Sequence, residues 1–274
     1  MIKRMLAIAV TELLIAARNR WIAIATALMI LFSLALTFAG SAPTGALGVD
    51  LLTVSVASMT TLSVYLVPLL ALLLAFDSIA GEVERGGLAL LLTHPVSRSE
   101  VLIGKLIAHI VALLVAIFLG LGAAGFAAWA AGGASAESIA ALSRLGWSAV
   151  LLGATFLSIG YALSALTRNS VSAAGMVIAI WVVFVVLYDL GLLGALVYDG
   201  GGYFTQQVFP WLLVANPADA FRLFNLAGSE SLAAATGLTG AVGAVPYWAV
   251  AASLLGWPLI ALLLARITLR RVEP

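Results

Sequence analysis

The side chains that could carry chemistry are concentrated between Phe76 and His109. This stretch holds three of the thirteen Lys and Arg residues, four of the twelve Asp and Glu residues and both histidines, whereas the flanking sequence is almost entirely apolar. Its charges are mixed in sign, which suits contact with a protein better than contact with lipid head groups. We therefore expect a polar segment that stands in water and has a coupling role.

Catalytic chemistry is not expected within this chain. There is no cysteine, and His94 and His109 stand too far apart in sequence to indicate a metal site. The phosphate-binding loop Gly-x4-Gly-Lys-Ser/Thr is also absent, because the nearest match, Gly104-Lys105, has Ser99 in place of the first glycine and Leu106 in place of the hydroxyl. We expect no catalytic residues, no metal and no cofactor here, and energy from a separate ATPase that binds ATP and Mg²⁺.

The elements that position the polar segment are membrane helices. The chain is 64% hydrophobic and only 9% charged, whereas about a quarter of the residues of a soluble domain are charged. Its uncharged runs have the length of spanning helices, and the alternating pattern of barrel strands is missing. The sequence therefore predicts an all-α, polytopic membrane protein with a single transmembrane domain over residues 1–274.

Six apolar stretches are long enough to cross a bilayer. We place the spans at about 21–40, 52–76, 102–131, 145–166, 171–190 and 246–265. Residues 2–18 show the amphipathic pattern of a helix that lies on the membrane surface, although a simple continuation of the first span is the alternative. Residues 77–100 form the polar hairpin, and residues 191–245 form the longest non-spanning region.

An even number of spans puts both termini on one side of the membrane. Eleven of the thirteen basic residues share that side with the hairpin, and only Arg144 and Arg222 lie on the other. Because loops rich in Lys and Arg stay in the cytoplasm, we expect both termini and the hairpin to be cytoplasmic. Residues 191–245 then face outward.

Within the hairpin, residues 81–92 are expected to form one short helix, with Glu82 and Arg85 spaced for an i,i+3 ion pair. Ser97 and Glu100 have the spacing of a capping box, which begins the third span. An ordinary solvated connection is the alternative, but about thirty residues is far longer than the two to eight that a bundle turn needs.

The hairpin resembles the signature of ABC-2-type transporter permeases. The resemblance lies in Asp77-x3-Gly81-Glu82-x-Glu84-Arg85-Gly86-Gly87-Leu88, followed by Thr93-His94-Pro95-Val96-Ser97-Arg98. In that family this segment holds the coupling helix, which sits in a cleft of the ATPase subunit. The resemblance implies an ATPase-coupling set of Asp77, Gly81, Glu82, Glu84, Arg85, Gly86, Gly87 and Arg98.

A second segment, Asn216 to Leu226, resembles the NosY-type permeases of the nitrous oxide reductase maturation transporter. This implies a homodimer in the bacterial inner membrane, with two NosF-like ATPases and a NosD-like periplasmic protein. It also implies a role in assembling the copper–sulfur site of the reductase, either by export of a sulfur-type species or by transmission of motion to the outer partner.

The same outer segment has its own local signals. Asn216 is a good N-cap, Pro217 suits the first helical position, and Asp219 and Arg222 are spaced for an ion pair. We expect a periplasmic partner or a gate at Asn216, Pro217, Asp219, Phe221 and Arg222. The alternative is the aromatic belt that membrane proteins carry at their interfaces.

Any passage through the bundle is expected to be lined by hydroxyls. The candidates are Thr60, Thr61, Ser63 and Tyr65 on the second span, with Ser158 and Tyr161 on the fourth. Serine and threonine also serve in helix packing, which is the alternative. His109 is expected to be a buried packing residue, and Asp189 to lie near the outer interface.

Three other functions are alternatives to the permease function that the resemblance implies. The first is an ABC-2 exporter permease for another small molecule or lipid. The second is a secondary transporter or channel, which would need paired intramembrane charges or broken helices in symmetric halves. The third is an intramembrane enzyme, which would need a nucleophile with its base or a cluster of metal ligands. The sequence shows neither of these last two patterns clearly.

Overall fold

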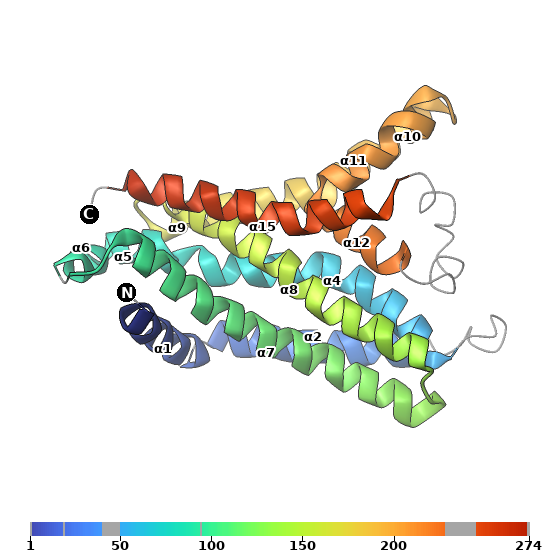
Figure 1. The fold of residues 1–274 in the computed structure, drawn as a ribbon, viewed down its shortest axis with the longest axis horizontal. Coiled ribbons are helices and arrows are strands. Elements are labelled where there is room, and N and C mark those ends of the chain that lie inside the picture. The colour runs from blue at the N-terminus through green and yellow to red at the C-terminus, as the bar shows by residue number, and fades with distance from the viewer. Residues whose placement is uncertain (1, 19, 40–49, 94, 228–244, 273–274) are drawn as a thin grey trace.

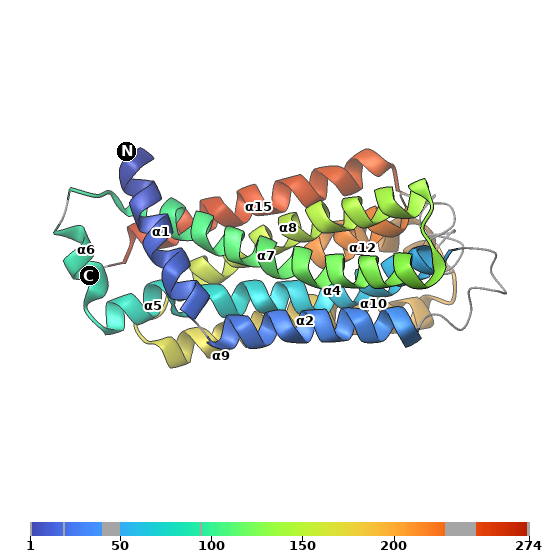
Figure 2. The same ribbon diagram turned by 90° about the horizontal axis from the view of Figure 1, so that it is seen from below.

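The computed structural model of the chain is a bundle of helices (Figure 1). It describes residues 2–18, 20–39, 50–93, 95–227 and 245–272, and all regular structure in them is helical. The long helices run along the longest dimension of the molecule, and α1 (Ile2–Arg18) crosses one end of them (Figure 2). We call this the hairpin end, because the polar hairpin and the close of the last helix lie beside α1, and we call the opposite end the far end.

Thirteen further helical segments follow α1 in the described residues. In chain order they are α2 (Arg20–Ala39), α4 (Leu51–Ala75), α5 (Asp77–Glu84), α6 (Gly87–Leu92), α7 (Arg98–Gly132), α8 (Ala136–Ser164), α9 (Ser170–Trp181), a π-helical segment (Val182–Leu187), α10 (Tyr188–Asp199), a second π-helical segment (Phe204–Val208), α11 (Phe209–Ala215), α12 (Pro217–Ala227) and α15 (Tyr247–Arg270).

Five helices of the described part are long and apolar enough to cross a membrane. They are Leu51–Glu84, α7, α8, Ser170–Asp199 and α15, and α2 adds a shorter apolar stretch, Thr26–Phe38. The predicted class, an all-α polytopic membrane protein, is therefore confirmed. The predicted helix over residues 2–18 is confirmed as well, and its exposed Ile2 and Leu6 form an apolar row of the kind that lies on a bilayer.

The core of the bundle lies where α4 packs against α8, with α7 and α15 on either side. Gly160 permits the close approach of α4 and α8, because a Cβ at this position would lie 2.6 Å from the Cβ of Ala75. By contrast, the helix from Ser170 to Asp199 leaves most of its surface outside the bundle. The two most buried spanning helices of the described part are thus α8 and the helix that leads into the hairpin.

Several helices extend beyond the predicted spans. The predicted fifth span, 171–190, is too short, because no residue ends the helix before Gly200, whose φ of +59° caps it. The region 191–245 therefore begins inside a helix and then contains α11 and α12, while its residues 228–244 lie outside the described part. Similarly, α8 begins earlier than the predicted residue 145, because Ser135 forms a capping box with Ser138.

Candidate functional site

The hairpin contains two short helices rather than the single helix that we predicted over residues 81–92. Phe76 keeps a helical backbone conformation, so α5 continues directly from α4. The break comes at Gly86, whose φ of +70° lies in the left-handed region. A glycine adopts this conformation without strain, and α6 then begins at Gly87. The second spanning helix and the first limb of the hairpin therefore form one nearly continuous rod.

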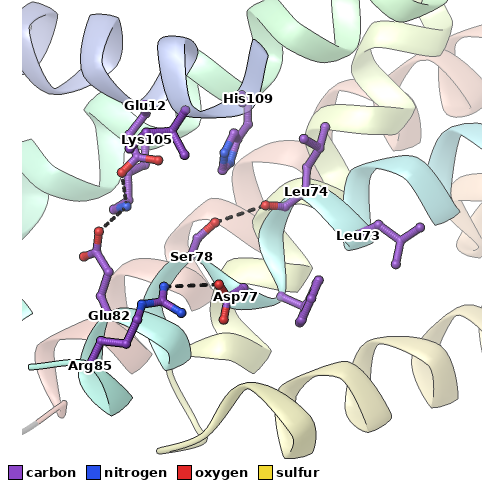
Figure 3. A pocket seen from close by; sticks show the side chains of 12 residues that line it. Glu12, Leu73, Leu74, Asp77, Ser78, Glu82, Arg85, Lys105 and His109 are labelled. Atoms are coloured by element: carbon purple, nitrogen blue, oxygen red, sulfur yellow. Dashed lines mark hydrogen bonds and ion pairs between the residues drawn. The ribbon is translucent and has the colours of Figure 1, made fainter. Parts of the chain in front are cut away.

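A buried lysine joins the hairpin to α1. Lys105 of α7 forms ion pairs with Glu12 of α1 and with Glu82 of α5, and its Nζ lies 2.6 Å from Glu82 Oε1 (Figure 3). Its side chain is only 2% exposed, so these partners are needed to keep the buried charge stable. The predicted ion pair of Glu82 with Arg85 is wrong. Arg85 instead pairs with Asp77, and its Nη2 lies 3.2 Å from Asp77 Oδ2.

The first limb is held by serines at the turn between α8 and α9. Ser164 Oγ donates to the carbonyl of Phe76 and accepts from the backbone N–H groups of Ile79 and Ala80, at 3.1 and 2.9 Å. Ser170 Oγ donates to Glu84 Oε2 at 2.8 Å and also to Asp77. Sequence reasoning missed both serines, since their partners lie more than eighty residues away.

The side chains around residue 81 explain why this position is a glycine. A Cβ at this position would lie 2.0 Å from Asp77 Oδ1 and 2.7 Å from an Arg85 nitrogen. The ion pair between Asp77 and Arg85 therefore passes across Gly81, in the space that a side chain would need. The motif residues Asp77, Gly81 and Arg85 form one local unit.

The second limb of the hairpin, which leads from α6 into the start of α7, is held by backbone carbonyls at the C-terminal end of α15. The capping box of Ser97 and Glu100 is confirmed, with Ser97 N 2.8 Å from Glu100 Oε2. Arg98 Nη1 donates to the carbonyls of Leu269, Arg270 and Val272, at 3.1, 2.9 and 2.6 Å. Arg98, which the resemblance suggested for ATPase contact, therefore caps the last turn of α15 in this structure.

The exposed residues at and just after the bend between α5 and α6 are Glu84, Arg85, Gly86, Ala89 and Leu90, and we call them the tip. Thr93, Pro95 and Ser97, farther along the hairpin, are exposed as well. Leu90 is 67% exposed. Leu88 does pack inside, with 2% exposure. Of the eight predicted coupling residues, Glu84, Arg85 and Gly86 belong to the tip, and Gly87 begins α6. Glu82 and Arg98 join the hairpin to other helices, as does Glu84 through Ser170, while Asp77 and Gly81 lie in the first limb.

A cavity of about 550 Å³ opens beneath the hairpin, between α1, α4, α5 and α7 (Figure 3). It is lined by Glu12, Ile15, Ala16, Leu73, Leu74, Phe76, Asp77, Ser78, Glu82, Arg85, Lys105 and His109. His109 is buried at its edge, and its Nδ1 lies 2.6 Å from the Tyr161 hydroxyl. This agrees with the expected packing role of His109.

The outer segment forms α12, at the far end of the bundle. Asn216 Oδ1 accepts from the N–H of Ala218 at 3.0 Å, and the predicted ion pair of Asp219 with Arg222 has a length of 3.0 Å. Phe221 has no exposed surface and packs in the core. Of the five residues predicted to meet a partner or form a gate, only Arg222 reaches the surface. Asp189, expected near the interface, pairs with Arg222 at 3.1 Å.

The predicted passage residues do not share one surface. Thr60, Ser63, Ser158 and Tyr161 are buried, and the hydroxyls of Thr60 and Ser158 donate to carbonyls one turn earlier on their own helices, at 2.8 Å. Thr61 and Tyr65 are exposed instead. Among the described residues, no group of three or more His, Cys, Asp or Glu side chains could hold a metal ion.

Comparisons with known proteins cover nearly the whole chain. The sequence profile of the family described as ABC-2 family transporter protein matches residues 6–273. A protein of Stutzerimonas stutzeri named probable ABC transporter permease protein NosY is 39% identical over 258 residues, which are 93% of each chain. A protein of the same name from Pseudomonas aeruginosa is 41% identical over 229 residues, or 83% of each chain.

Proposed function

Since this chain belongs to the ABC-2 transporter family and is a membrane-spanning permease, we propose that the tip of its hairpin is the docking surface for a separate ATPase. The observation that carries this proposal is the contrast within the hairpin. The first limb is held by the buried Lys105 and by Ser164, and the second limb is held by the hydrogen bonds of Arg98. The tip, by contrast, is exposed. Displacement of the tip by a partner would therefore move α4, α7 and α15 together.

The proposed assembly follows the proteins named NosY. It contains two copies of this chain, two NosF-like ATPases that bind ATP and Mg²⁺, and a NosD-like periplasmic protein at the far end. Similarity to the Stutzerimonas stutzeri protein over 93% of both chains supports it. The helix from Ser170 to Asp199 is the least buried of the five candidate spans of the described part, so we place the contact with the second copy on it.

For the cargo, we propose a role in assembling the copper–sulfur site of nitrous oxide reductase. The buried polar groups of α4 and α8 include the hydroxyls of Thr60, Ser63 and Ser158. Hydroxyls are poor ligands for copper compared with thiolate, thioether or imidazole. A sulfur-type species, or motion passed to the periplasmic partner, fits these groups better than copper does.

Docking can be tested by changing the tip. The test co-expresses the chain with a NosF-like P-loop ATPase and measures co-purification and ATP hydrolysis. We expect Leu90→Asp to abolish co-purification, because a charge would replace an exposed apolar contact. Tyr198→Asp, at an even more exposed position of the far end, serves as the matched control and should bind like the wild type. Retention of the ATPase by the Leu90→Asp variant would refute the tip as the docking surface.

We further propose that the hairpin end faces the cytoplasm of a bacterium, with the protein in the inner membrane. The chain has no cysteine, so a single cysteine in place of Leu90 or Tyr198 reports on one end alone. A membrane-impermeant thiol reagent added to spheroplasts should label the Tyr198→Cys variant and spare the Leu90→Cys variant until the membrane is opened. The reverse pattern would refute this orientation.

A further inference from the structure

Three charged side chains meet toward the far end of the bundle, where α12 comes close to the first turn of α10. Arg222 stands between two carboxylates: its Nη1 is 3.0 Å from Asp219 Oδ1, and its Nη2 is 3.1 Å from Asp189 Oδ2. Asp189 belongs to α10, whereas Asp219 and Arg222 belong to α12. The cluster therefore connects the two helices.

The cluster has one carboxylate more than its base can neutralise. The side chain of Asp219 is only 2% exposed, and its Oδ2 has no hydrogen-bond partner within the described residues. A buried carboxylate oxygen without a donor is strongly disfavoured. A proton on this oxygen would remove the excess charge and provide a donor for the neighbouring carboxylate of Asp189.

The neighbouring elements offer Asp219 no second ion pair among the described residues. Arg144 of α8 donates to the carbonyl of Asn225, at the other end of α12, at 3.1 Å. The hydroxyl of Tyr188, next to Asp189, donates to the carbonyl of Leu212 at 2.7 Å. The remaining titratable groups on the packed helices are Glu137 and Tyr161 of α8, Tyr247, Arg266 and Arg270 of α15, Tyr65 of α4, and Tyr198 and Asp199 of α10, and α11 has none.

The electrostatics agree with this geometry. The pKa of Asp219 is raised from its ordinary value to about 7. Burial is the largest cause, and the nearby charge of Asp189 raises the pKa as well, while the Arg222 guanidinium lowers it. Asp189 is partly exposed, with 30% of its side chain accessible. The cluster therefore reaches the surface of the chain, and a proton can enter it from there.

We propose that Asp219 binds one proton at its unpartnered oxygen, beside Asp189, and that this proton holds α12 at the first turn of α10. Uptake of a proton from water changes the formal charge of the cluster from −1 to zero, since Arg222 stays charged throughout. Release of the proton leaves two carboxylates on one guanidinium and weakens the contact between the helices. The inference rests on the contacts at the far end alone and does not depend on the docking surface proposed for the tip.

Infrared spectroscopy of the whole chain in lipid nanodiscs tests this proposal, because a protonated carboxylic acid has a carbonyl band that a carboxylate lacks. The titration runs from about pH 5 to about pH 9. We expect the wild type to lose such a band with a midpoint near pH 7, and the Asp219→Asn variant to lack it. Asp189→Asn should move the midpoint to lower pH, since it removes the neighbouring negative charge.

Glu137→Gln is the matched control, because Glu137 is an exposed carboxylate at the same end of the bundle. This variant should keep the band and its midpoint. The proposal is overturned if the wild type shows no titrating band over this range, if the band persists in Asp219→Asn, or if it disappears in Glu137→Gln. Should Asp219→Asn fail to fold, the wild-type titration and the shift in Asp189→Asn still decide the matter.

Discussion

Each end of the bundle holds one basic side chain between two carboxylates, yet the two clusters bury opposite charges. At the hairpin end the base, Lys105, is the buried member, and Glu12 and Glu82 line a cavity large enough for water. At the far end an acid, Asp219, is the buried member, while Arg222 and Asp189 reach the surface. The composition of the clusters is alike, and their exposure to water differs.

The difference determines what each cluster can do. A buried base between two acids needs both partners, so the hairpin cluster is a structural joint between α1, α5 and α7. Glu82 also has an oxygen without a hydrogen-bond partner, Oε2, but its side chain is 17% exposed and lines the cavity, which is large enough for water. The side chain of Asp219 is only 2% exposed, so its Oδ2 is satisfied by a proton instead, and we expect the far-end cluster to respond to pH. Which member is buried, rather than the number of charges, separates a fixed joint from a titrating one.

The largest expected effect on stability, and the strongest test of this comparison, comes from removing both acids of the hairpin cluster. The double variant Glu12→Gln and Glu82→Gln leaves Lys105 buried without a counter-charge, and we expect a loss of about 3–5 kcal/mol in the free energy of unfolding. Denaturant unfolding in detergent micelles measures it. Adding Lys105→Met to the double variant should restore most of the loss, because it removes the buried charge. A double variant as stable as the wild type would show that the joint is not needed.

A smaller effect should separate the two ends by pH. The pKa of Asp219 is raised to about 7 in the folded protein, so the folded state holds a proton that the unfolded state releases near pH 4. The stabilisation linked to that proton is complete below about pH 4 and is lost as the pH rises to about 7, at about 1.4 kcal/mol for each pH unit.

Thermal unfolding at a series of pH values measures this effect. The Asp219→Asn variant should lose the part of the pH dependence that falls in this window, whereas Glu137→Gln should keep it. An unchanged pH dependence in Asp219→Asn would remove the distinction between the two clusters.

The smallest effect is expected at the tip. Arg85 and Asp77 form an ion pair whose side chains are 62% and 40% exposed, and exposed pairs contribute at most about 1 kcal/mol. We therefore expect Arg85→Ala to leave the free energy of unfolding nearly unchanged while it lowers the ATP hydrolysis of the assembled complex. A large loss of stability would mean that Arg85 belongs to the joint rather than to the docking surface.

Features that depend on neighbours in the sequence could be predicted. The capping box of Ser97 and Glu100 and the ion pair of Asp219 and Arg222 follow from spacings of three residues on a helix, and both are present. The membrane-protein class likewise follows from apolar runs of sufficient length. In each case the interaction forms within a single turn or a single helix, so no knowledge of packing is required.

Features that depend on tertiary packing could not be predicted. The local rule paired Glu82 with Arg85, but the buried Lys105 takes Glu82, because a charge without water gains more from the pair than an exposed one does. Ser164, Ser170 and the carbonyls that Arg98 reaches lie far away in the sequence and give no local signal. The burial of Phe221 was equally hidden, since an aromatic residue in an outer segment suits an interface as well as a core.

The hydrogen bonds from Arg98 to the final turn of α15 have a consequence for the order of folding during synthesis. The carbonyl of Leu269 comes 171 residues after Arg98 along the chain, so the ribosome completes the hairpin long before it makes the groups that fix the second limb. We therefore expect the second limb of the hairpin to stay without these hydrogen bonds until α15 has been made, and the docking surface that we propose to be complete only then.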